Sequence, residues 1–132
     1  MKRLLMLVFA VAATVGLQAP ALAAPASTSR QIGSCTAQGD FAVCDASGTA
    51  RHHPVRIYLH VRATPRQSVS GAWDITCAKG TGAGSSSGSF SGGTPINRRL
   101  HHPYQHPDYC IVAADGQLTR HGHLHVWLTY TG

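Results

Sequence analysis

The chain has 132 residues, 12% of them charged, and a net charge of +6 at neutral pH. This length favours a single domain. Because the chain contains five Asp and no Glu, few pairs of carboxylates are available for acid–base catalysis.

Residues 1–23 have the three parts of a secretory signal peptide. Lys2 and Arg3 begin a basic segment, residues 4–17 are apolar, and Ala21-Leu22-Ala23 provides the small residues of a cleavage site. The apolar run is shorter than the roughly 20 residues that a spanning helix needs. Cleavage of 23 residues from 132 leaves 109, with no later segment apolar enough to cross a membrane. We therefore expect a secreted protein, with residues 24–30 disordered before the domain 31–132.

The remaining chain alternates apolar and polar residues with a period of two, which predicts strands. Turn-forming residues separate these strands, and we see no amphipathic helix. Residues 80–93 contain only Gly, Ser, Thr, Ala and Phe90, and predict either a mobile loop or a weak edge strand. The sequence predicts an all-β, small antiparallel sandwich, immunoglobulin-like in architecture, with a small barrel as the rival. About seven strands are expected, near residues 32–37, 40–46, 54–63, 67–77, 85–99, 108–114 and 118–130.

Four cysteines in an exported chain predict two disulfides. We favour Cys35–Cys44, which flanks a short connection with Gly39 at its turn, and Cys77–Cys110, which joins two predicted strands. The spacing lacks the CxxC pairs of a typical zinc site, so zinc binding by these cysteines is disfavoured.

The segment 121–130, HGHLHVWLTY, places histidines on alternate positions of a predicted strand. His123 and His125 would lie about 6.8 Å apart on one face, and His60 occupies the equivalent polar face of another strand. If these strands share a sheet, the three imidazoles could bind zinc or copper. The alternative is a solvated strand face without a cofactor. Carboxylates usually orient ligand histidines, and the chain has only five Asp and no Glu for this task, which favours the alternative. Trp127 lies on the same face and is a candidate anchor for a partner.

A second candidate surface is the loop 96–109, which is stiffened by Pro103 and Pro107. Arginine and histidine side chains bind phosphate or carboxylate oxygens, and tyrosine rings contact sugars. After signal-peptide removal nine basic residues and five Asp remain, a net charge of +4, which favours anionic partners such as cell-wall polymers. Nucleic acid is a less favoured partner. The candidate binding residues are Arg98, Arg99, His101, His102, Tyr104, His106 and Trp127.

The sequence contains no clear sign of an enzyme. No GxSxG or HExxH motif is present, and all cysteines are expected in disulfides. Cleavage of a phosphodiester by two histidines and a cation is the one chemistry that the composition supports. We therefore expect a non-catalytic binding module for an extracellular anionic or polysaccharide partner. The alternatives are an extracellular metal-binding protein and a small secreted hydrolase such as a nuclease.

Three stretches resemble small secreted actinobacterial proteins of no assigned activity: SVSGAWDITCAKGTGAGSSSGSF (68–90), NRRLHHPYQHPDYCIV (97–112) and LHVWLTY (124–130). The likeness covers most of the chain from Cys35 onwards. It implies secretion and a β-rich domain, and it carries no catalytic residue to this sequence.

Overall fold

The computed structural model describes residues 28–132. The expected signal peptide, 1–23, and most of the segment 24–30 lie outside the described residues. The described part contains eight strands and no helix. The strands are β1 (Arg30–Gly39), β2 (Val43–Ala50), β3 (Arg56–Thr64), β4 (Ser68–Lys79), β5 (Gly82–Gly93), β6 (Ile96–Leu100), β7 (Tyr109–Leu118) and β8 (Gly122–Thr131).

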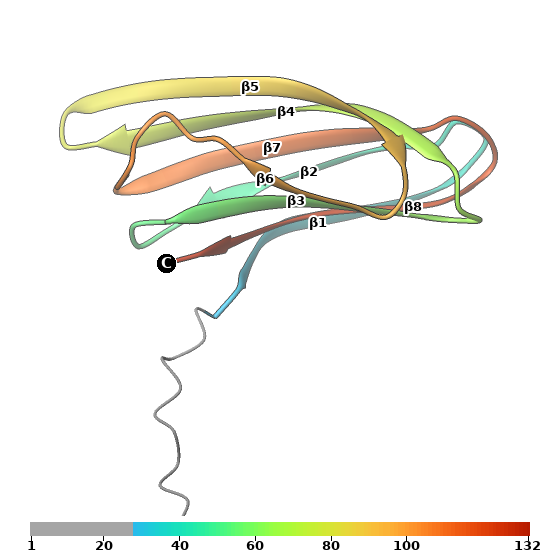
Figure 1. Ribbon diagram of the computed structural model, residues 1–132, viewed down its shortest axis with the longest axis horizontal. Coiled ribbons are helices and arrows are strands. Elements are labelled where there is room, and N and C mark those ends of the chain that lie inside the picture. The colour runs from blue at the N-terminus through green and yellow to red at the C-terminus, as the bar shows by residue number, and fades with distance from the viewer. Residues whose placement is uncertain (1–27) are drawn as a thin grey trace, which may run out of the picture.

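The strands form two four-stranded antiparallel sheets. The first sheet has the order β1-β8-β3-β6 and the second has the order β2-β7-β4-β5. Figure 1 shows the elongated strands of the two layers running nearly along one axis. Only β4 and β5 are consecutive partners within one sheet, so every other connection passes from one sheet to the other. The expected all-β sandwich is confirmed.

The core lies between the sheets and follows from the period of two. On β3 the side chains of Ile57, Leu59 and Val61 are fully buried, and on β8 Leu124, Val126 and Leu128 are buried in the same way. They contribute to one cluster with residues of the second sheet such as Ile75 and Val112. The intervening residues of β3 and β8 therefore face outwards.

The prediction of one strand over residues 85–99 is wrong. This segment contributes to two strands, β5 and β6, which belong to different sheets. Pro95, which lacks a backbone N–H, lies in the short connection between them. The Gly- and Ser-rich segment is the edge strand of the second sheet, and Phe90 is buried at 6% exposure. This strand accounts for the eighth element.

The structure contains the disulfides Cys35–Cys44 and Cys77–Cys110, the same pairing that the sequence favours. Cys35 lies on β1 and Cys44 on β2, so this bond joins the two sheets at one corner. Cys77 and Cys110 lie directly opposite each other on β4 and β7, within one sheet. Two disulfides are typical of an oxidising, extracellular environment. No helix in residues 28–132 has the length and hydropathy of a membrane span.

Candidate functional site

The outer surface of the first sheet gathers most of the residues that the sequence singles out. Because β8 lies between β1 and β3, the outward histidines of β8 and His60 of β3 share one surface. In the register of this sheet His60 is opposite Trp127, and Arg62 is opposite His125. We call this surface the cationic face; it comprises Arg56, Tyr58, His60, Arg62, Asn97, Arg99, His123, His125, Trp127 and Thr129.

Trp127 is the centre of the cationic face. Its indole stacks with the imidazole of His60 at 5.0 Å between ring centroids and with that of His125 at 4.4 Å. The guanidinium carbon of Arg62 lies 5.4 Å from the centre of the indole, within the range of a cation–π interaction. Tyr58 extends the row, with its ring centre 6.3 Å from that of His60. The indole is therefore held by two imidazoles and a guanidinium.

The imidazole of His60 is held by hydrogen bonds at both nitrogens. Its Nδ1 lies 2.7 Å from Oδ1 of Asn97, which accepts the hydrogen bond, and its Nε2 lies 2.9 Å from the hydroxyl oxygen of Thr129, which can donate or accept. A metal would have to displace one of these partners.

The three histidines considered for a metal are not arranged as one cluster. Trp127 stacks with both His60 and His125, and His123 lies two positions further along β8. Over the described range 28–132, no group of three or more His, Cys, Asp or Glu side chains is placed to hold a metal ion. The rings of His60 and His125 instead each stack on the ring of Trp127.

The charge of the cationic face has one sign. It carries three arginines, Arg56, Arg62 and Arg99, and the outward positions of the first sheet contain no carboxylate within the described residues. Arg56 and Arg62 are six residues apart on β3, which corresponds to about 20 Å. At one end of the face, the side chains of Arg62, His123 and His125 line a shallow depression with Thr36 of β1. The arginines of the cationic face are therefore spread over a length that would span several repeating units of an extended polymer.

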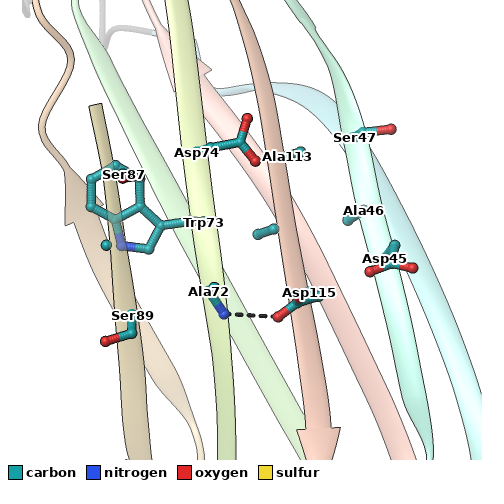
Figure 2. Close-up of a pocket in the computed structure, with 12 residues that line it drawn as sticks. Asp45, Ala46, Ser47, Ala72, Trp73, Asp74, Ser87, Ser89, Ala113 and Asp115 are labelled. Atoms are coloured by element: carbon teal, nitrogen blue, oxygen red, sulfur yellow. Dashed lines mark hydrogen bonds between the residues drawn. The ribbon is translucent and has the colours of Figure 1, made fainter. Parts of the chain in front are cut away.

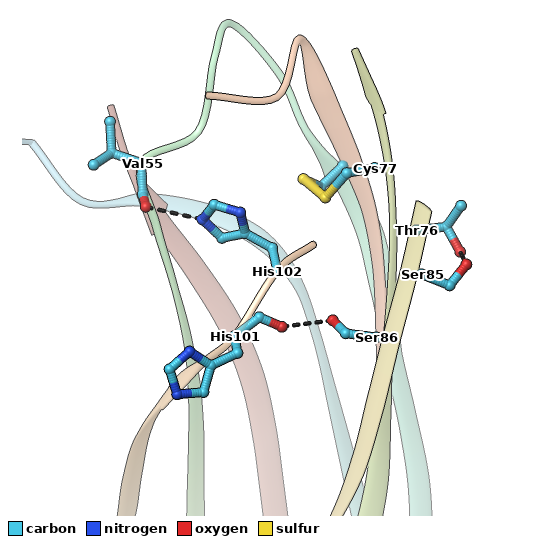
Figure 3. Close-up of a disulfide and its surroundings, with 8 residues drawn as sticks. Val55, Thr76, Cys77, Ser85, Ser86, His101 and His102 are labelled. Carbon is cyan, nitrogen blue, oxygen red and sulfur yellow. Dashed lines mark hydrogen bonds between the residues drawn. A yellow bond between two sulfur atoms is a disulfide. The ribbon is translucent and has the colours of Figure 1, made fainter. Parts of the chain in front are cut away.

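The candidate residues of the loop 96–109 are divided among different surroundings, and Figure 3 shows two of them, His101 and His102. Arg99 is on the cationic face opposite Tyr58, whereas Arg98 reaches β5 and donates to the carbonyl oxygen of Ser89 at 3.1 Å. His102 donates from Nε2 to the carbonyl oxygen of Val55 at 3.0 Å. Tyr104 packs against the core. These contacts give Arg98, His102 and Tyr104 structural partners.

His101 and His106 are the remaining histidines of this loop. Both have exposed side chains. They line a second depression together with Arg99 and Val55. Arg99 therefore connects this loop to the cationic face, and among the sequence candidates only Arg99 and Trp127 belong to that face together with His60, His123 and His125.

The outer surface of the second sheet has the opposite charge, which the sequence interpretation missed. Asp45, Asp74 and Asp115 line one hollow across β2, β4 and β7 (Figure 2). Asp45 is directly opposite Asp115, and Oδ1 of Asp115 accepts the backbone N–H of Ala72 at 2.8 Å. Alternation along each strand indicates from the sequence that these three Asp face outwards. It does not indicate that β2, β7 and β4 are neighbours in one sheet, and so it could not predict that the three Asp lie together.

No family of known proteins, no curated protein and no solved structure matches this chain significantly.

Proposed function

We propose that the protein is a secreted, non-catalytic binding module for an extracellular anionic polymer, and that the cationic face is its binding surface. The observation that carries this proposal is the single sign of charge around the Trp127 stack. Arg62 contacts the indole, Arg56 and Arg99 extend the charge along the sheet, and the described outward positions hold no opposing carboxylate.

The arrangement favours an anionic polymer over a neutral one. The indole of Trp127 already contacts His60, His125 and Arg62, so it is less available for stacking on a neutral sugar ring. The accessible groups are guanidinium and imidazole N–H donors, which bind carboxylate, sulfate or phosphate oxygens. An acidic polysaccharide or an anionic cell-wall polymer supplies such groups at regular intervals.

The test uses the mature, oxidised protein with polygalacturonate as the polyanion and dextran as the neutral polymer. Isothermal titration calorimetry at increasing NaCl is expected to show binding of polygalacturonate that weakens with salt, and no binding of dextran. The double variant Arg62→Gln/Arg99→Gln is expected to lose roughly tenfold in affinity, if each exposed ion pair contributes up to about 1 kcal/mol.

Arg51→Gln/Lys79→Gln is the matched control, because Arg51 and Lys79 are exposed and lie outside the cationic face, in the connection between β2 and β3 and on β4 of the second sheet. Both double variants lose two positive charges, so a non-specific effect of net charge would weaken binding equally in both. Equal loss in the control, binding of dextran, or tighter binding of single-stranded DNA than of polygalacturonate would contradict the proposal.

A further inference from the structure

β5 is an unusual edge strand. With 12 residues it is among the longest strands, it is paired only with β4, and its sequence GAGSSSGSFSGG contains no charge and no proline. Its register with β4 runs from Ser68–Gly93 to Lys79–Gly82 without a shift, so no bulge interrupts it. Natural edge strands avoid pairing with other chains through charges, prolines, bulges, shortness or a loop that covers the edge. β5 has none of the first four, and the loop 101–104 contacts it at Gly82, Gly84 and Ser86, which alternate with the outward residues of the strand.

The other three edge strands are protected. β6 has five residues and includes Arg98 and Arg99. β1 begins with Arg30 and has an irregularity between Gln31 and Gly33. β2 carries an outward Asp45 and packs beside β1 at the corner that Cys35–Cys44 closes. The absence of protection is therefore specific to β5.

The orientation of the free backbone groups follows from two hydrogen bonds. Ala72, which is opposite Ser89, donates its N–H to Asp115 on the other side, so the backbone of Ala72 faces β7. Residues opposite each other in an antiparallel ladder either exchange both bonds or none. The N–H and C=O of Ser89 therefore face away from β4, where Arg98 donates to the carbonyl oxygen.

Because the register is unbroken, Ala83, Ser85 and Ser87 have the same orientation as Ser89. Their side chains are exposed. No backbone hydrogen bond in the described part of the chain reaches their outer edge. The segment Ala83–Ser87 is thus a free template for one more antiparallel strand.

We propose that β5 pairs antiparallel with β5 of a second copy of this chain, which joins the two second sheets into one continuous sheet. Symmetry about Ser85 places Ala83 of one copy opposite Ser87 of the other and avoids Ser89, whose carbonyl oxygen Arg98 occupies.

A second copy fits this edge better than a foreign peptide does. Strand addition by a foreign peptide gains specificity from pockets for alternate side chains. The outward side chains at the centre of this edge, Ala83 and Ser85, are small, and the hollow that contains Asp45, Asp74 and Asp115 reaches β5 at Ser87, Gly88 and Ser89. Self-pairing about Ser85 instead places the Ser85 hydroxyls of the two copies opposite each other, as the hydroxyls of Thr76 and Ser85 already lie at 3.1 Å across β4 and β5. Residues 82–93 carry no charge, so like charges do not oppose the approach of two copies at this edge.

The pairing is tested by amide exchange of the mature protein at about 0.02 and about 1 mM, because a contact this small produces a transient dimer. The amides of Ala83, Ser85 and Ser87 are expected to gain protection at the higher concentration. Sedimentation velocity is expected to show a dimer that 1 M NaCl does not weaken, since no charges meet. Salt-weakened association would instead indicate the cationic face and would overturn the proposal.

Two lysine variants localise the contact. Ser85→Lys places like charges opposite each other at the two-fold axis and is expected to raise the dissociation constant at least about tenfold. Ser70→Lys, the matched control, adds the same charge to the same sheet on the central strand β4 and is expected to change it less than about twofold.

Ser87→Pro is a second variant for the same edge. Proline removes one outward N–H and is tolerated where that group faces solvent, so thermal unfolding by circular dichroism is expected to stay close to that of the parent. Its dimer is expected to be lost. A monomer at about 1 mM, an equal effect of Ser70→Lys, or association that survives Ser85→Lys or Ser87→Pro would overturn the proposal.

Discussion

At the scale of single residues, the structure assigns His60 to a structural network within the cationic face. Its ring stacks on Trp127, and both of its nitrogens are hydrogen-bonded, to Asn97 and Thr129. A hydrogen bond of this kind contributes about 1 kcal/mol. Binding of a metal to His60 would replace one of these hydrogen bonds.

Zinc titration of the mature protein is expected to leave the imidazole NMR signals of His60 unchanged at one equivalent of metal. The exposed rings of His123 and His125 are expected to show only weak, non-saturating shifts, because the third ligand of a zinc site is missing from their described surroundings. Copper is the second metal to titrate. Saturable, stoichiometric shifts of His60, His123 and His125 together would contradict this expectation and would support a metal centre.

At the scale of elements, β1 and β2 belong to different sheets although they are consecutive. Their backbones cross in contact at Gly33 of β1 and Gly48 of β2. A Cβ atom on Gly33 would overlap the carbonyl oxygen of Ser47, and one on Gly48 would overlap that of Ile32. Glycine is therefore required at both positions for the corner of the sandwich to close.

Gly33→Ala is expected to lower the free energy of unfolding by about 1–3 kcal/mol, because the backbones must separate to admit the methyl group. Urea unfolding measures this change. Gly93→Ala is the matched control, since a Cβ there meets no atom within 4 Å, and it is expected to be neutral or slightly stabilising. Equal destabilisation by both variants would show that the corner contact is not the cause.

At the scale of the whole molecule, the two disulfides have different roles. Cys35–Cys44 joins the sheets across a short connection, with a sequence separation of 9, whereas Cys77–Cys110 ties two neighbouring strands and closes a loop with a separation of 33. Closing a longer loop removes more entropy from the unfolded chain.

Replacement of Cys77 and Cys110 by Ala is expected to cost about 3.8 kcal/mol of unfolding free energy, against about 2.7 kcal/mol for Cys35 and Cys44. Burial of Cys77 and Cys110, at 1% and 0% exposure, adds to the first cost. Urea unfolding of the two double variants gives the order. A larger loss on removing Cys35–Cys44 would mean that the link between sheets, and not loop length, dominates.

The two outer surfaces of the molecule also carry opposite charge, and this separation arises from strand order. The outer surface of the first sheet carries Arg56, Arg62 and Arg99, and that of the second carries Asp45, Asp74 and Asp115. The period of two within each strand already places Arg62 and Asp74 on the outward side. Only the assembly of four strands from distant parts of the chain concentrates each sign on one surface.

The sequence by itself determined the all-β class, the outward direction of His60, His123, His125 and Trp127, and a plausible pairing of the cysteines. The strand class and the outward directions depend on local alternation of apolar and polar residues, and the cysteine pairing depends on the number and spacing of the cysteines. Both can be read without knowing which strands are neighbours. Their functional consequence remained open, because alternation states which side of a strand a residue occupies and not which strand lies beside it.

Only the tertiary structure decided that His60 stacks on Trp127, that Arg99 lies on the cationic face and not in a loop, and that β5 is an exposed edge strand of its sheet. Each of these facts depends on the register between strands far apart in the chain, such as β3 and β8. Register is set by the joint burial of both sheets in one core and not by local residue preference. For this reason local pattern identified the residues of the candidate site, and long-range packing brought them together.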